Sequence, residues 1–117
     1  MRTLRSIMLG SVMVALLAPV IHPAGAEATR AMSPGQLITL AKCESGLRPE
    51  VVSKGGKYHG LFQFDQSTWN GVAVRAGRPD LAGLKPSRVH FLNQIYLAQQ
   101  LFKERGRQPW PVCGRRI

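Results

Sequence analysis

The 117-residue chain is poor in acidic residues and in cysteine. It has 6 Asp and Glu against 16 Lys and Arg, which gives a formal net charge of +10. Its 2 cysteines are too few for the usual cysteine-rich zinc sites or for an iron–sulfur cluster. The sequence has no Walker-type phosphate-binding loop and no His-Glu-x-x-His motif, which argues against nucleotide hydrolysis and common zinc-protease chemistry. We therefore expect no metal and no cofactor.

The length and the hydrophobic content of 44% suit a single globular domain rather than a disordered tail. Gly and Pro follow no period, which excludes fibrous and low-complexity classes. A basic start with Arg2 and Arg5 precedes an apolar run over residues 7–18, and the small residues Ala24-Gly25-Ala26 follow. This layout is typical of a secretory signal peptide. The run of about 12 residues is shorter than the ~20 that span a bilayer, although an uncleaved anchor is the alternative.

We therefore expect a signal peptide over residues 1–26, a short lead over 27–32 and one domain over 33–117, secreted and without stable membrane insertion after cleavage. In an oxidising compartment, Cys43 and Cys113 are expected to form one disulfide, with free thiols or an intermolecular bridge as the alternative.

The basic charge favours the bacterial wall over nucleic acid as a partner, or is simply a solvated surface. We expect a monomer.

The start of a first helix is encoded by Ser33, Pro34 and Gln36, which suit an N-cap, the first helical position and a capping box. Gly46 is the expected stop. Residues 47–60 read as a loop with room for a small hairpin, and residues 61–64 as a short extended run.

Two further helices follow. Asp65 or Ser67 is the expected cap of the second, which ends near Gly77. After a Pro- and Gly-containing connection, Ser87 is the expected cap of the third helix and Gly106 its stop. The pattern predicts a compact fold of the α+β class that is mainly α.

Glu44 is the strongest candidate for a catalytic residue. At about 100° per residue it falls about 20° from Leu37, in the middle of the apolar stripe of the first helix. Burial of a carboxyl raises its pKa, as a general acid at neutral pH requires. The alternative is that Glu44 pairs with Lys42 or Arg48, or points into solvent.

A second carboxylate is needed by ordinary retaining and inverting glycosidases. Asp65 is the best candidate because aromatic and small polar residues flank it, although it also suits a helix N-cap. Aromatic rings such as Tyr58 and Trp69, with amides such as Gln63 nearby, suit sugar faces and hydroxyls. Plain core packing is the alternative for these rings.

Four segments carry a resemblance to a known family. They are Cys43-Glu44-Ser45-Gly46, the run from Gly60 to Trp69, Gln94-Ile95, and Trp110-Pro111-Val112-Cys113. In this order they resemble the resuscitation-promoting factors, which are secreted actinobacterial muralytic proteins with a small lysozyme-like domain. The first two also resemble soluble lytic transglycosylases. The resemblance covers about residues 33–114.

The resemblance implies that Glu44 is the catalytic acid, that Asp65 and Thr68 bind substrate, and that Cys43 and Cys113 form a disulfide. It implies a lytic transglycosylase that cleaves the bond between N-acetylmuramic acid and N-acetylglucosamine in peptidoglycan glycan strands.

One position departs from the family, because Arg105, which is counted among the expected substrate-binding residues, stands where a glutamine is frequent. A muramidase-type hydrolase of the same bond remains an alternative function. So does a non-catalytic wall-binding or signalling module. Another cell-wall hydrolase is a possible partner.

Overall fold

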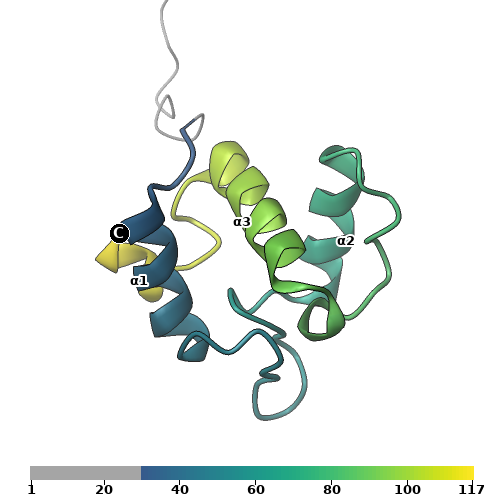
Figure 1. Cartoon of the computed structure of the whole chain (residues 1–117), viewed down its shortest axis with the longest axis horizontal. Coiled ribbons are helices and arrows are strands. Elements are labelled where there is room, and N and C mark those ends of the chain that lie inside the picture. Colours follow the sequence, from purple (N-terminus) through teal and green to yellow (C-terminus); the bar gives the residue numbers. More distant parts are fainter. Residues whose placement is uncertain (1–29) are drawn as a thin grey trace, which may run out of the picture.

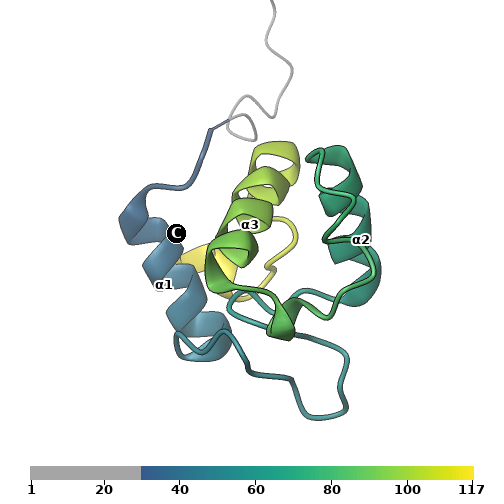
Figure 2. The ribbon, with the colours of Figure 1, turned by 45° about the vertical axis from the view of Figure 1, so that its right-hand side comes forward.

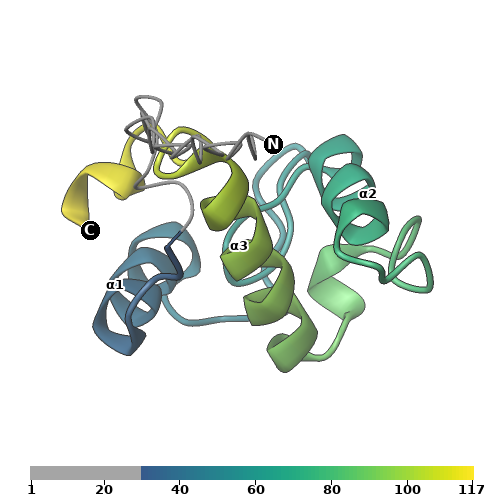
Figure 3. The same ribbon diagram turned by 90° about the horizontal axis from the view of Figure 1, so that it is seen from above.

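The computed structural model describes residues 30–117. Its elements are the α-helices α1 (Pro34–Ser45), α2 (Gln66–Arg75) and α3 (Phe91–Arg105), and the short 3-10 helices η2 (Pro86–Arg88) and η3 (Cys113–Arg116). Helix α3 lies between α1 and α2 in all three views, and η3 lies beside α1 (Figures 1, 2 and 3). The β structure of this part of the chain consists of two isolated bridges, between Val52 and His59 and between His59 and Phe64. The prediction of a mainly helical fold is confirmed.

The start and the end of α1 follow its sequence signals. The Ser33 hydroxyl accepts a hydrogen bond from the Gln36 backbone N–H at 3.1 Å, and the Gln36 side chain accepts one from the Ser33 N–H at 2.9 Å. This reciprocal capping box satisfies two N–H groups that the helix leaves unpaired. Gly46 ends the helix with φ 64°, a left-handed conformation that glycine adopts without steric cost.

Helix α2 is capped by Asp65, whose Oδ1 accepts a hydrogen bond from the Thr68 backbone N–H at 2.7 Å. Of the two expected caps, Asp65 is therefore the one used. The helix ends at Arg75, two residues before Gly77, as the sequence indicates.

The predicted start of the third helix is wrong by several residues. Ser87 lies inside η2, and Val89 is extended with ψ 145°, which interrupts the helical path. Helix α3 begins at Phe91, and the His90 ring Nδ1 accepts a hydrogen bond from the Leu92 backbone N–H at 3.2 Å. The predicted stop at Gly106 is confirmed.

The segment 61–64 is a turn rather than the predicted extended run. The Gln63 N–H donates to the Gly60 carbonyl at 3.2 Å, and Gln63 has φ 52°. The extended pairing begins at Phe64, which exchanges two backbone hydrogen bonds with His59. The predicted small hairpin is present only as single bridged pairs.

The buried amide of Gln94 holds this turn against α3. Its Oε1 accepts a hydrogen bond from the Leu61 N–H at 2.8 Å. Its Nε2 donates to the carbonyls of Pro49 at 3.1 Å and Val89 at 2.9 Å. An amide buried without such partners would be costly, so the full set of bonds fixes the loop in one position.

A methyl group at Gly60 has no room in this arrangement. A Cβ there would lie 2.2 Å from the Gln94 Oε1, and Gly60 has φ 83°. We expect Gly60→Ala to lower the free energy of unfolding by about 3 kcal/mol, from backbone strain plus the displaced buried amide. Gly55→Ala is the control, because Gly55 has φ 94° with nothing within 4 Å of the added Cβ. That variant should lose only about 1 kcal/mol in urea unfolding, and equal losses would contradict the prediction.

The core lies on the inner faces of the three helices. Leu40 of α1, Trp69 of α2 and Leu97 of α3 are fully buried. The rings of Phe64 and Trp69 meet edge to face with centroids 5.2 Å apart. This packing sets Phe64, and with it the neighbouring Asp65, at the side of the domain where the candidate site lies.

Candidate active site

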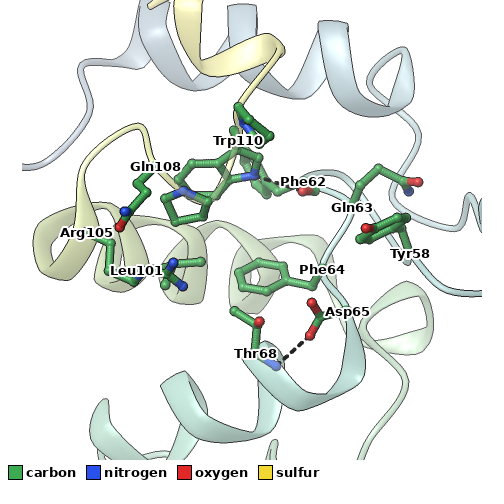
Figure 4. A pocket seen from close by; sticks show the side chains of 12 residues that line it. Tyr58, Phe62, Gln63, Phe64, Asp65, Thr68, Leu101, Arg105, Gln108 and Trp110 are labelled. Atoms are coloured by element: carbon green, nitrogen blue, oxygen red, sulfur yellow. Dashed lines mark hydrogen bonds between the residues drawn. The ribbon is translucent and has the colours of Figure 1, made fainter.

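Two adjoining hollows share one wall at the side of the domain, and the two together are called the groove here. One, called the Glu44 hollow here, is lined by Glu44, Val112 and Cys113 in addition to the shared wall. The other, called the Asp65 hollow, includes Asp65, Thr68, Leu101, Arg105 and Gln108 (Figure 4). The shared wall consists of Tyr58, Gln63, Pro109, Trp110 and Pro111.

Glu44 lies in the last turn of α1 and faces the Glu44 hollow. It is half-buried, and this loss of hydration raises the pKa of its carboxyl above the ordinary value of 4.5. The two ion pairs found within residues 30–117 join other groups, Arg75 with Glu104 and Arg78 with Asp80. Arg48 instead donates through Nε to the Ser45 carbonyl at 3.0 Å. The pairing of Glu44 with Lys42 or Arg48, which the sequence left open, is therefore absent here.

The disulfide between Cys43 and Cys113 is present, as predicted, with the two Cα atoms 5.7 Å apart. It joins α1 to η3 across a sequence separation of 70 residues. Because Cys43 precedes Glu44 and Cys113 lines the same hollow, the bond fixes the acid against the opposite wall.

The indole of Trp110 belongs to that shared wall and is fixed in place. Its Nε1 donates to the Phe62 carbonyl at 3.0 Å, and the ring is almost wholly buried. This bond ties the segment after α3 to the turn before α2. Trp110 was not among the predicted substrate-binding residues, although its Trp-Pro-x-Cys segment was one of the four that carry the resemblance.

Asp65 and Thr68 lie together in the Asp65 hollow, as their predicted roles require (Figure 4). The Asp65 carboxylate caps α2 through one oxygen and also lines the hollow. Asp65 can therefore be both the N-cap of α2 and a residue of the groove wall.

Tyr58 and Gln63 line both hollows, beside the tip of the loop. The Tyr58 ring is 40% exposed, and the Lys57 ammonium lies 5.3 Å from its centroid. The Gln63 amide donates to the Gly60 carbonyl at 2.9 Å, which orients the side chain at the rim. Both predicted binding residues thus face the groove.

Trp69 does not line either hollow, so its prediction as a substrate-binding residue is wrong. Its exposed fraction is 0%, and its Nε1 donates to the Leu81 carbonyl at 2.8 Å. The ring packs into the core from the inner face of α2, which a short sequence window cannot distinguish from a surface position.

Arg105 and Gln108 complete the far end of the Asp65 hollow (Figure 4). Arg105 is a predicted substrate-binding residue, and Gln108 is not among the predicted site residues. Gln108 precedes the Trp-Pro-x-Cys segment by only two positions, and the predicted disulfide from Cys113 to Cys43 in the first helix is the signal that could have identified it.

The predicted signal peptide, residues 1–26, and residues 27–29 of the predicted lead lie outside the described residues. Within residues 30–117, no helix is long and apolar enough to span a bilayer.

Comparison with known proteins identifies a family for most of the described chain. The profile of the transglycosylase-like domain family matches residues 33–113. Resuscitation-promoting factor RpfA of Mycobacterium tuberculosis is 36% identical over 92 residues, which are 77% of this chain and 20% of that protein. RpfE of the same organism is 33% identical over 82 residues, 66% of this chain and 40% of that protein.

RpfC of Mycobacterium tuberculosis is 35% identical over 75 residues, 64% of this chain and 47% of that protein. The chain thus spans less than half of the length of each of these relatives. The resemblance drawn from the sequence segments is confirmed, and its four segments lie within the matched range. The chain belongs to the transglycosylase-like domain family.

Proposed function

We propose that this protein is a secreted enzyme that cleaves the glycan strands of peptidoglycan. The observation that carries the proposal is the half-buried carboxyl of Glu44, which faces the groove and whose pKa burial raises. The relatives are named resuscitation-promoting factors, which agrees with the muralytic family that the sequence resembles. We further propose that residues 33–117 form the catalytic domain and that residues 1–26 direct its export.

In the proposed reaction, Glu44 acts first as a general acid. It donates its proton to the glycosidic oxygen between N-acetylmuramic acid and N-acetylglucosamine while the bond from that oxygen to the anomeric carbon breaks. The Glu44 carboxylate then takes the proton of the muramic acid 6-hydroxyl, whose oxygen attacks the same anomeric carbon. The products are a 1,6-anhydro end and a free 4-hydroxyl, and Glu44 regains its proton.

This lytic transglycosylase route needs only one catalytic carboxyl. The neighbouring Asp65 uses one oxygen to cap α2, which supports a binding or electrostatic role rather than a water-activating one. A muramidase would instead add water at the anomeric carbon, with Asp65 assisting that water.

Mass analysis of the fragments that the purified protein releases from peptidoglycan tests the proposal. Anhydro ends are expected. Reducing ends would replace the transglycosylase with the muramidase, and intact glycan strands with retained binding would indicate a wall-binding module.

The role of Asp65 is tested by Asp65→Asn. Asparagine caps a helix about as well as aspartate, so the free energy of unfolding should change by only a few tenths of a kcal/mol. If the carboxylate contacts the substrate or stabilises positive charge at the anomeric carbon, kcat/KM should fall by about tenfold or more. Ser67→Ala, on an exposed side chain next to the same cap, is the control. Unchanged cleavage by Asp65→Asn would leave Asp65 with a purely structural role.

A further inference from the structure

The Arg105 guanidinium lacks a carboxylate partner in the part of the chain that the structure describes. The two ion pairs of residues 30–117 use other groups, and one of them takes the adjacent acid, because Glu104 binds Arg75 at 2.9 Å. Asp65 lines the same hollow, but its hydrogen bond in the structure goes to the Thr68 N–H. Arg105 therefore places an uncompensated positive charge in the wall of the groove.

The side chain is placed to meet a ligand. Arg105 is the last residue of α3, and its side chain lies beside Leu101 in the Asp65 hollow, with the Gln108 amide close by (Figure 4). The hollow adjoins the Glu44 hollow, with which it shares the wall of Tyr58, Gln63, Pro109, Trp110 and Pro111. A strand that follows both hollows would meet Glu44 in one and Arg105 in the other.

The chemistry of the guanidinium selects the kind of group it meets. Its fork of N–H donors binds a planar carboxylate through two parallel hydrogen bonds, and such charge-assisted pairs are about twice as strong as neutral ones. Sugar hydroxyls and acetamido groups carry no charge, and the lactyl carboxyl of N-acetylmuramic acid is neutral while it forms the amide to a peptide stem. An arginine in the groove is therefore better matched to an anionic substituent of the strand than to its sugar rings.

We propose that Arg105 binds an anionic group attached to the glycan, namely a carboxylate of the peptide stem on N-acetylmuramic acid. The protein would then prefer strands that carry peptides over bare strands. This inference rests on the proposed function, because it takes the strand in the groove to be peptidoglycan. A phosphate group on the strand would offer the same anionic chemistry, and the experiment separates the two sources.

The test compares Arg105→Gln with the wild type on three preparations of the same strands. The first carries intact peptide stems. The second has had its stems removed by an amidase, which hydrolyses the amide to the stem and leaves only the short lactyl carboxylate on N-acetylmuramic acid. The third has had its phosphate-linked polymers removed while keeping its stems. Lys103→Gln is the matched control, since Lys103 is exposed near the same end of α3, carries the same charge and does not line the groove.

We expect Arg105→Gln to lower kcat/KM on peptide-bearing strands by about fivefold more than on stripped strands. Arg105→Lys keeps the charge but lacks the fork of N–H donors, so its kcat/KM on peptide-bearing strands should lie between the values of the wild type and of Arg105→Gln. Lys103→Gln should leave the ratio between the two substrates at its wild-type value. Removal of the phosphate-linked polymers should not change the effect of Arg105→Gln.

Three results would overturn the inference. They are an unchanged ratio in Arg105→Gln, an equal shift in Lys103→Gln, or an effect that disappears with the phosphate-linked polymers. If the wild type cleaves no glycan, the proposed function fails on its own. Co-sedimentation of wild type and Arg105→Gln with insoluble peptidoglycan, with and without peptide stems, then still tests Arg105. Equal binding by the two proteins to peptide-bearing material would contradict its assigned role.

Discussion

Replacing Glu44 with glutamine is expected to lower the rate of glycan cleavage by about 10²–10⁴-fold, the usual contribution of a general acid. Glutamine keeps the size and the hydrogen-bonding capacity of the side chain but has no proton to give to the glycosidic oxygen. The fold should persist, because Glu44 takes part in none of the ion pairs found within residues 30–117. Release of soluble fragments from labelled peptidoglycan measures the rate.

The control is Glu50→Gln, which removes the charge of an exposed carboxylate that lines neither hollow of the groove. Its cleavage rate should match that of the wild type. Wild-type activity in a folded Glu44→Gln protein would contradict the catalytic role of Glu44.

The same variant tests the environment of the carboxyl through stability. Because burial raises the pKa of Glu44, the folded protein keeps this proton at pH values where the unfolded chain has released it. That extra proton affinity stabilises the folded state below the ordinary pKa of 4.5, and the contribution is lost as the pH rises through the raised pKa. Above the raised pKa the wild type bears the cost of a partly dehydrated carboxylate, which Glu44→Gln removes.

Urea unfolding at two pH values measures this effect. The stability of Glu44→Gln relative to the wild type should be higher at pH 7 than at pH 4. Cleavage by the wild type should decline as the pH rises through the raised pKa, because the acid form is then lost. A stability difference that does not vary with pH would mean that the carboxyl is fully hydrated.

Local signals predicted the ends of the helices where the signal and its partner lie close in the sequence. Ser33 with Gln36, and Asp65 with Thr68, are only three residues apart, so each cap could be recognised before the structure. Gly46 and Gly106 are likewise local stops. The position of Glu44 also follows from the helix that these signals define, and this is why its place at the groove could be anticipated.

The errors arose where distant contacts decide the local structure. The turn at residues 61–64 depends on the bond from the Leu61 N–H to Gln94, 33 residues away. The same amide binds the Val89 carbonyl in the extended segment that delays the start of α3. The spacing of apolar residues along the sequence, from which the helices were predicted, contains no information on the hydrogen bonds of a buried amide.

The side chains of the groove were likewise predicted where local sequence decides their position and missed where distant contacts do. Asp65 and Thr68 were identified because they belong to a contiguous motif. Trp69 belongs to the same motif but is fully buried in the core, where its ring nitrogen donates a hydrogen bond to the Leu81 carbonyl, 12 residues away. Gln108 is not among the predicted residues, because its segment is held at the groove in part by the bond from Trp110 to the Phe62 carbonyl, a contact between distant parts of the chain.

Removal of the disulfide, by the double change Cys43→Ala and Cys113→Ala, is expected to have the largest effect on stability. The bond closes a loop with a sequence separation of 70 residues. Loop-closure entropy predicts a loss of roughly 4 kcal/mol in the free energy of unfolding, a value that depends on the chain-entropy model. For a domain of this size, whose total stability is of order 5–15 kcal/mol, this is a large fraction. Urea unfolding of the two proteins measures it.

The disulfide variant should also lose activity beyond what its lower stability explains. Without the bond, η3 and the Cys113 wall of the Glu44 hollow are no longer tied to the turn of α1 that carries the acid. Leu97→Ala is the matched control, because Leu97 is fully buried in α3, lines neither hollow, and its truncation costs about 2–5 kcal/mol. At a temperature where circular dichroism shows both variants folded, the disulfide variant should cleave glycan more slowly than Leu97→Ala. Equal rates would mean that the bond serves the fold alone and that Glu44 keeps its position without it.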